Sequence, residues 1–257
     1  MKKTLILTGV MLAVTCSMAW AAGLSMGWST AVANDCPSSP ASSVNRNSLC
    51  TANTGSNVII GSVVAPGGLN DVVGESVIVD YQEKAATLSD WWNFGGCRST
   101  PSSSAVLNMA FDPSLDDGIC GDLWALNGTS AFSFTPNFPN PGFGRLTMVG
   151  AVATSLGGPW PAGTEQYSFR LSIDNRHTVA GTLPVCVGCL DGVLFAFNYA
   201  QINNAVGTGQ DANIVSGDPN GHQCISWQNG GGTGGLVCPG IVPTQRATWG
   251  QVKSLYR

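Results

Sequence analysis

Few residues of this chain could perform acid–base or nucleophilic chemistry. It has two histidines, His177 and His222, and three glutamates, Glu75, Glu83 and Glu165. A glycosidase needs two carboxyl groups flanking the sugar, and a Ser-His-Asp triad needs three converging groups. Both histidines adjoin turn sequences, where solvated side chains are usual, and Glu75 and Glu165 begin predicted strands, where exposure is usual. The sequence therefore favours a non-catalytic protein.

A secreted hydrolase acting on glycan or ester substrates is the alternative. It requires at least two titratable groups to meet in a cleft with perturbed pKa values. The candidates for this role are Glu75, Glu165, Asp112, Asp174, His177 and His222.

The motif Cys186-Val187-Gly188-Cys189 is compatible with a redox dithiol, half of a zinc site or a small disulfide ring. A thioredoxin-type motif opens a helix after a strand, whereas a strand-like run follows this one. A zinc site would need Cys224 and Cys238 as its second pair, and the thirteen residues between them exceed the usual tight spacing. A structural disulfide is the preferred interpretation.

Residues 112–118 place oxygen-bearing side chains at alternate positions before a glycine, as a calcium loop does. The glycine falls one position late for an EF-hand, and no bidentate glutamate follows it. An acidic turn leading to Cys120 is therefore the simpler interpretation. No metal or other cofactor is expected.

Tryptophan provides the most specific functional hint. Trp91 and Trp92 are adjacent, so in a strand they face opposite sides, and at least one is expected outside the core. Trp124 lies near a turn. Exposed indole rings could stack on sugars, with neighbouring amides as hydrogen-bond partners, so these three residues are the candidate ligand-binding residues. The competing interpretation is that they pack over disulfides and cap the ends of a sandwich.

The elements that position these residues are predicted to be short β-strands. In residues 165–174 apolar and polar side chains alternate, with Tyr167, Phe169, Leu171 and Ile173 expected on one face. Further strand candidates are 58–64, 76–82, 105–111, 131–134, 145–153, 177–181, 191–201 and 223–228. Gly- and Pro-rich turns separate nearly all of them. This organisation indicates an all-β fold, an antiparallel β-sandwich or jelly roll.

The two ends of the chain depart from this pattern. Residues 1–21 have the basic start, apolar stretch and small-x-small ending of a signal peptide, so residues 22–257 are expected to form one exported domain. A lipid anchor at Cys16 is the rival interpretation. The C-terminal residues 248–257 resemble a capped short helix, or alternatively a segment read by an export or attachment machine. The stretch 155–163 could join two half-sandwiches, and no segment of the mature chain is apolar enough to span a membrane.

Eight cysteines follow the predicted signal, and their number indicates an oxidising compartment such as the periplasm, the cell surface or the exterior. Sequence alone leaves their connectivity open. Closing short loops costs the least entropy, which favours pairing of sequence neighbours. The expected pairs are Cys36 with Cys50, Cys97 with Cys120, Cys186 with Cys189, and Cys224 with Cys238.

Charge argues against a nucleic-acid partner. The formal net charge is −4 and becomes more negative when Lys2 and Lys3 leave with the signal. No basic stripe of the kind that binds phosphates is present outside the C-terminal stretch. Charged residues make up 10% of the chain, against about 25% in ordinary domains, so the surface must consist mainly of neutral polar residues.

Two segments carry a family resemblance: Trp91-Trp92-Asn93-Phe94 with Cys97-Arg98, and the ending Ala247 to Arg257. With the CxxC pair, they resemble an uncharacterised group of secreted bacterial β proteins. The resemblance implies export and a single shared architecture, and it implies no activity or cofactor. The expected function is that of a non-catalytic extracytoplasmic binding protein or a surface or matrix component, with glycans or cell-surface components as partners.

Overall fold

The structure is a computed structural model that describes residues 22–29, 36–37, 43–67, 69–99, 106–111, 120–124, 128–181, 184–205, 211–215, 217, 222–230 and 238. These residues form twelve strands and two short 3-10 helices, η1 (Cys97–Ser99) and η2 (Thr154–Leu156). Three expected features lie outside the described residues: the signal peptide (1–21), the acidic segment (112–118) and the C-terminal helix (248–257).

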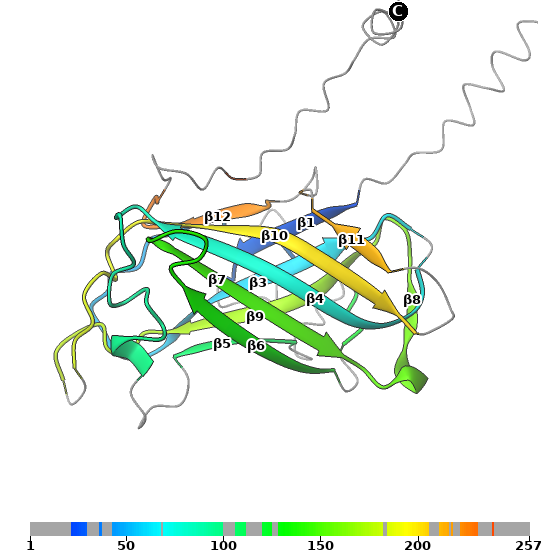
Figure 1. Cartoon of the computed structure of the whole chain (residues 1–257), viewed down its shortest axis with the longest axis horizontal. Coiled ribbons are helices and arrows are strands. Elements are labelled where there is room, and N and C mark those ends of the chain that lie inside the picture. Colours follow the sequence, from blue (N-terminus) through cyan, green and yellow to red (C-terminus); the bar gives the residue numbers. More distant parts are fainter. Residues whose placement is uncertain are drawn as a thin grey trace, which may run out of the picture.

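Two sheets lie face to face in an antiparallel β-sandwich, as predicted (Figure 1). The four-stranded sheet has the order β1 (Gly23–Trp28), β3 (Ser56–Val64), β9 (Glu165–Asp174) and β5 (Leu107–Ala110). The eight-stranded sheet has the path β2 (Asn45–Arg46), β12 (Cys224–Trp227), β10 (Val193–Asn204), β4 (Leu69–Glu83), β7 (Phe143–Ala151) and β6 (Thr129–Pro136). On this sheet β11 (Ala212–Ile214) also pairs with β10, and β8 (Gly158–Trp160) pairs with β4. The short pairing of β12 with β2 is parallel.

The strand predicted at 177–181 is wrong, whereas the other strand candidates each overlap an observed strand. Asn53 explains the exception, because its Oδ1 accepts hydrogen bonds from the backbone N–H groups of Thr178 and Val179 at 2.8 and 2.9 Å. Its Nδ2 donates to the Val179 carbonyl at 2.8 Å. A side chain thus satisfies the backbone groups that a neighbouring strand would otherwise pair.

The face assigned to Tyr167 is also wrong, because the register of β3 and β9 shifts there. Phe169 pairs with Gly61 and Tyr167 with Ser62, so Ser168 is the extra residue of a β-bulge. Phe169 belongs to the main core between the sheets, but Tyr167 belongs to a smaller cluster beside Cys36 and Cys120. The bulge directs Ser168 towards the eight-stranded sheet, where it contacts β4.

All eight expected cysteines form disulfides, but three of the four expected pairings are wrong. The observed pairs are Cys36–Cys120, Cys50–Cys189, Cys97–Cys186 and Cys224–Cys238. The first three span 84, 139 and 89 positions, because the sandwich brings loops that are distant in sequence together. The CxxC cysteines bind different partners, which excludes the small ring, the redox dithiol and the zinc site. Four disulfides indicate an oxidising, extracytoplasmic environment.

The two long edges of the sandwich differ. At one edge, Trp28 of β1 and Ser43 exchange backbone hydrogen bonds of 2.8 and 3.4 Å, and the chain then enters β2. At the other edge, β5 and β6 lie side by side in opposite sheets, and no ladder joins them (Figure 1). A hydrogen bond of 3.2 Å joins the two sheets at that edge, donated by the N–H of Phe111, just after β5, to Ser130 Oγ of β6. In the part of the chain that the structure describes, this edge is therefore joined by fewer hydrogen bonds than the other.

Candidate functional site

The three candidate ligand-binding tryptophans are buried. Trp91 and Trp92 are 0% exposed and Trp124 is 1% exposed, so the expectation that one of the adjacent pair lies outside the core is wrong. Trp91 stacks on Trp227 with ring centroids 5.5 Å apart, and Trp124 donates from Nε1 to the Tyr167 carbonyl at 2.9 Å. The segment holding Trp91 and Trp92 is a turn whose two indole rings join the main core, so strand alternation does not apply to it. No face of these rings is available for a sugar.

Glu75 lies in the middle of β4, not at a strand start, and its side chain is fully buried between the sheets. Its Oε1 accepts a hydrogen bond of 2.7 Å from Ser168 Oγ of the opposite sheet. Burial raises the pKa of Glu75 to about 8. The expectation of an exposed carboxylate is wrong, and at neutral pH the favoured state is a neutral carboxyl group.

The remaining candidate catalytic groups have separate partners. His177 is fully buried with a φ of 70°, and its Nδ1 lies 2.9 Å from the Pro184 carbonyl oxygen, so the prediction of a solvated side chain is wrong for it. The Asp174 carboxylate accepts a hydrogen bond of 2.8 Å from Arg176 Nε. His222 is exposed, as expected. These contacts do not join one candidate group to another.

Glu165 lies next to the disulfide between Cys36 and Cys120. Its carboxylate accepts a hydrogen bond from Ser62 Oγ, and potential ligand atoms of Glu165 and both cysteines lie within 4.8 Å of one another. The two sulfurs are bonded to each other, so neither is a thiolate that could hold a metal. Asp112, the last candidate, lies outside the described residues.

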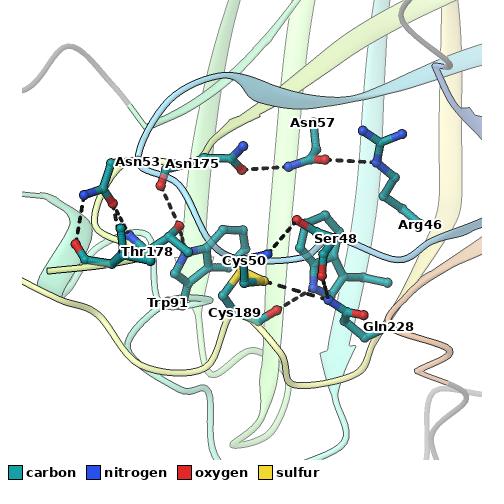
Figure 2. The surroundings of a disulfide bond; sticks show 12 residues. Arg46, Ser48, Cys50, Asn53, Asn57, Trp91, Asn175, Thr178, Cys189 and Gln228 are labelled. Carbon is teal, nitrogen blue, oxygen red and sulfur yellow. Dashed lines mark hydrogen bonds between the residues drawn. A yellow bond between two sulfur atoms is a disulfide. The ribbon is translucent and has the colours of Figure 1, made fainter.

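A polar groove of about 310 Å³ lies beside the Cys50–Cys189 disulfide (Figure 2). We call it the amide groove. Its walls come from the end of β2, the following segment, the start of β3 and the residue after β9. The lining residues are Arg46, Asn47, Ser48, Leu49, Cys50, Thr51, Ala52, Gly55, Ser56, Asn57 and Asn175. This lining contains one cation and no carboxylate.

A chain of side-chain hydrogen bonds crosses the groove, as Figure 2 shows. Arg46 Nε donates to Asn57 Oδ1 at 3.1 Å, and Asn57 Nδ2 donates to Asn175 Oδ1 at 2.8 Å. Asn175 Nδ2 donates in turn to the Thr54 carbonyl at 3.1 Å. Within the described part of the chain, the two terminal nitrogens of Arg46 donate to no protein atom. The arginine is thus held by Nε while its outer N–H groups stay available.

The groove rests on fixed structure. Gln228 Nε2 donates to the Ser48 carbonyl at 2.5 Å, and the Cys50 disulfide ties the same segment to the loop after β9. On the opposite side, Thr178 Oγ1 donates to the Asn175 carbonyl at 2.5 Å and accepts a hydrogen bond of 3.0 Å from Trp91 Nε1. A polar site supported by packed side chains loses little conformational entropy when it binds a ligand.

No sequence pattern identified this groove. Arg46 and Asn57 are 11 positions apart, and Asn57 and Asn175 are 118 apart. The only local signal is the run Asn45-Arg46-Asn47, which is unremarkable in a chain rich in neutral polar residues.

In the described residues, no helix is both long and apolar enough to cross a membrane. A scan against protein-family models, a search of curated proteins and a search of solved structures each found no match to this chain.

Proposed function

We propose that this is an exported, non-catalytic binding protein that holds a polyhydroxylated ligand, a glycan, in the amide groove. The observation that carries the proposal is the state of Arg46, a lining residue whose Nε is fixed by Asn57 while its terminal N–H groups have no partner among the described residues. Such groups are preorganised donors for hydroxyl or ring oxygens.

The composition of the groove supports a neutral or weakly acidic sugar. Amide and hydroxyl side chains offer both donors and acceptors, which match the mixed character of sugar hydroxyls. Leu49 is 83% exposed at the groove and offers an apolar surface to the C–H face of a ring. With a volume of about 310 Å³, the groove is at the lower end of small-molecule sites and suits the end of a glycan better than a long internal segment.

The non-catalytic part of the proposal rests on the absence of an acid–base pair among the lining residues, all of which are described. Glycoside hydrolysis needs two carboxyl groups near the bond that is cut. The groove lining has none.

The test is a titration of the oxidised protein against a panel of glycans, with calorimetric detection and product analysis of the same samples. We expect saturable binding without products, and at least a tenfold loss of affinity in Arg46→Gln. Arg176→Gln is the matched control, because it removes the same charge outside the groove. Equal effects of both variants, or no binding, would refute the groove assignment, and released products would favour the hydrolase.

A further inference from the structure

A second hollow, of about 270 Å³, lies at the edge of the sandwich formed by β5 and β6. Its wall is mostly apolar and includes Phe94, Phe132 and Phe134. Phe132 and Phe134 project from β6 and are only half-buried, although they face inward. The polar residues of the wall are Arg98 and Ser99.

Arg98 is a buried cation, with 0% of its surface exposed. Its Nη1 donates to the Trp91 carbonyl at 3.1 Å, and its Nη2 donates to the Asp174 carbonyl. The guanidinium carbon lies 4.0 Å from the centroid of the Trp91 ring. Its Nε has no hydrogen-bond partner among the described residues.

The charge of Arg98 is poorly compensated. The carboxylate of Asp174, the nearby acidic group, is engaged by Arg176 at 2.8 Å. Burial lowers the pKa of Arg98 to about 9, which leaves the guanidinium protonated at neutral pH. Among the described residues no carboxylate hydrogen-bonds to Arg98, and a buried charge without such a partner is costly, so a carboxylate that reached it would be favoured.

We propose that this hollow binds a small amphiphilic carboxylate, with the carboxylate at Arg98 and the apolar part against the three phenylalanines. Two independent features support this ligand class. Phe132 and Phe134 in the apolar wall are only half-buried. Arg98, whose Nε has no hydrogen-bond partner among the described residues, supplies the complementary charge in the same wall.

The probes are 4-phenylbutyrate and its neutral counterpart 4-phenylbutanamide, titrated by calorimetry and by tryptophan fluorescence, since Trp91 stacks against Arg98. We expect the carboxylate to bind at least tenfold more tightly than the amide. Equal affinities, or no binding of the carboxylate, would overturn the proposal. The outcome is independent of glycan binding, because the probes carry no sugar and Arg46→Gln should leave them unaffected.

Variants at Arg98 itself could fail to fold, so the decisive variant is Ser99→Asp, which places a competing carboxylate in the wall. We expect it to weaken phenylbutyrate binding at least tenfold. Ser133→Asp is the matched control, because Ser133 lies on β6 between the two phenylalanines but is exposed and does not line the hollow. Phe132→Ala should weaken binding of both probes. Equal effects of the two aspartate substitutions would contradict the site.

Discussion

Glu75→Gln should stabilise the protein at neutral pH and remove part of its pH dependence. The side chain of Glu75 is fully buried, and among the described residues its one hydrogen bond comes from Ser168 Oγ, while Oε2 has no partner there. Burial raises its pKa from 4.5 to about 8 in the folded protein. Between these values the folded state binds a proton that the unfolded state has lost, so the free energy of unfolding falls as pH rises.

The magnitude follows from the difference between the two pKa values. Below pH 4.5 Glu75 is protonated in both the folded and the unfolded protein, so its burial does not lower the free energy of unfolding there. At about 1.4 kcal/mol per pH unit, the loss reaches about 3 kcal/mol at pH 7 and about 4 kcal/mol at pH 8, where the folded-state group is itself half ionised. Glutamine stays neutral at every pH and keeps an oxygen for Ser168. The variant should therefore equal the wild type near pH 4.5 and exceed its stability by about 3 kcal/mol at pH 7.

The assay is urea unfolding with intact disulfides, followed by tryptophan fluorescence at pH 5, 6, 7 and 8. Taking the difference between variant and wild type isolates Glu75 from other groups. One of these is Glu83, whose pKa is raised to about 7 by burial and the neighbouring Asp191. Glu165→Gln, at a half-buried carboxylate, is the control for loss of a negative charge. A difference that stays constant from pH 5 to pH 8 would refute the reasoning.

Two further variants test what stabilises the fold, namely a disulfide and the packing of the core. Replacing Cys50 and Cys189 together by alanine opens a cross-link spanning 139 positions, of which the intact Cys97–Cys186 bond leaves an effective loop of about 50 residues in the unfolded chain. The double variant should therefore lose about 4 kcal/mol, measured by urea unfolding against the oxidised wild type; an unchanged midpoint would contradict this. Gly150→Ala places a Cβ 2.1 Å from the Phe111 ring and should cost about 1–3 kcal/mol, seen as a lower Tm. Gly95→Ala, whose Cβ meets nothing closer than 3.7 Å, is the control and should leave Tm unchanged; similar losses at both glycines would count against the packing argument.

The alternating pattern of β4 contained more information than the sequence interpretation used. Period-two alternation through Val77, Val79 and Tyr81 places Glu75 and Glu83 on the same inward face, and the structure buries all five. The prediction of an exposed Glu75 failed because the strand was expected to begin at residue 76. Strand β4 in fact begins at Leu69, six positions before Glu75. Burial of a carboxyl group depends on the opposite sheet, and the hydroxyl that meets Glu75 comes from a β-bulge that the sequence pattern does not show.

The disulfide connectivity and the amide groove could not be predicted from the sequence, because both depend on how the two sheets are arranged. The entropic advantage of a short loop grows only with the logarithm of loop length, so strand pairing easily outweighs it. Cys50 meets Cys189 because the segment before β3 and the loop after β9 end at the same end of the sandwich, and Arg46 meets Asn57 there as well. Positions of this kind are determined by the topology of two sheets, which single-sequence periodicity does not specify.

Trp91, one of the three candidate tryptophans, lies between the two proposed sites. On one side, the Trp91 ring lies 4.0 Å from the guanidinium of Arg98, in the wall of the apolar hollow. On the other, Trp91 Nε1 holds Thr178, whose hydroxyl donates to the Asn175 carbonyl at the amide groove (Figure 2). A buried tryptophan can contact a cation with its ring and hydrogen-bond to a polar group with its N–H while remaining shielded from solvent. Trp91 therefore positions residues of both proposed sites while its own ring stays in the core.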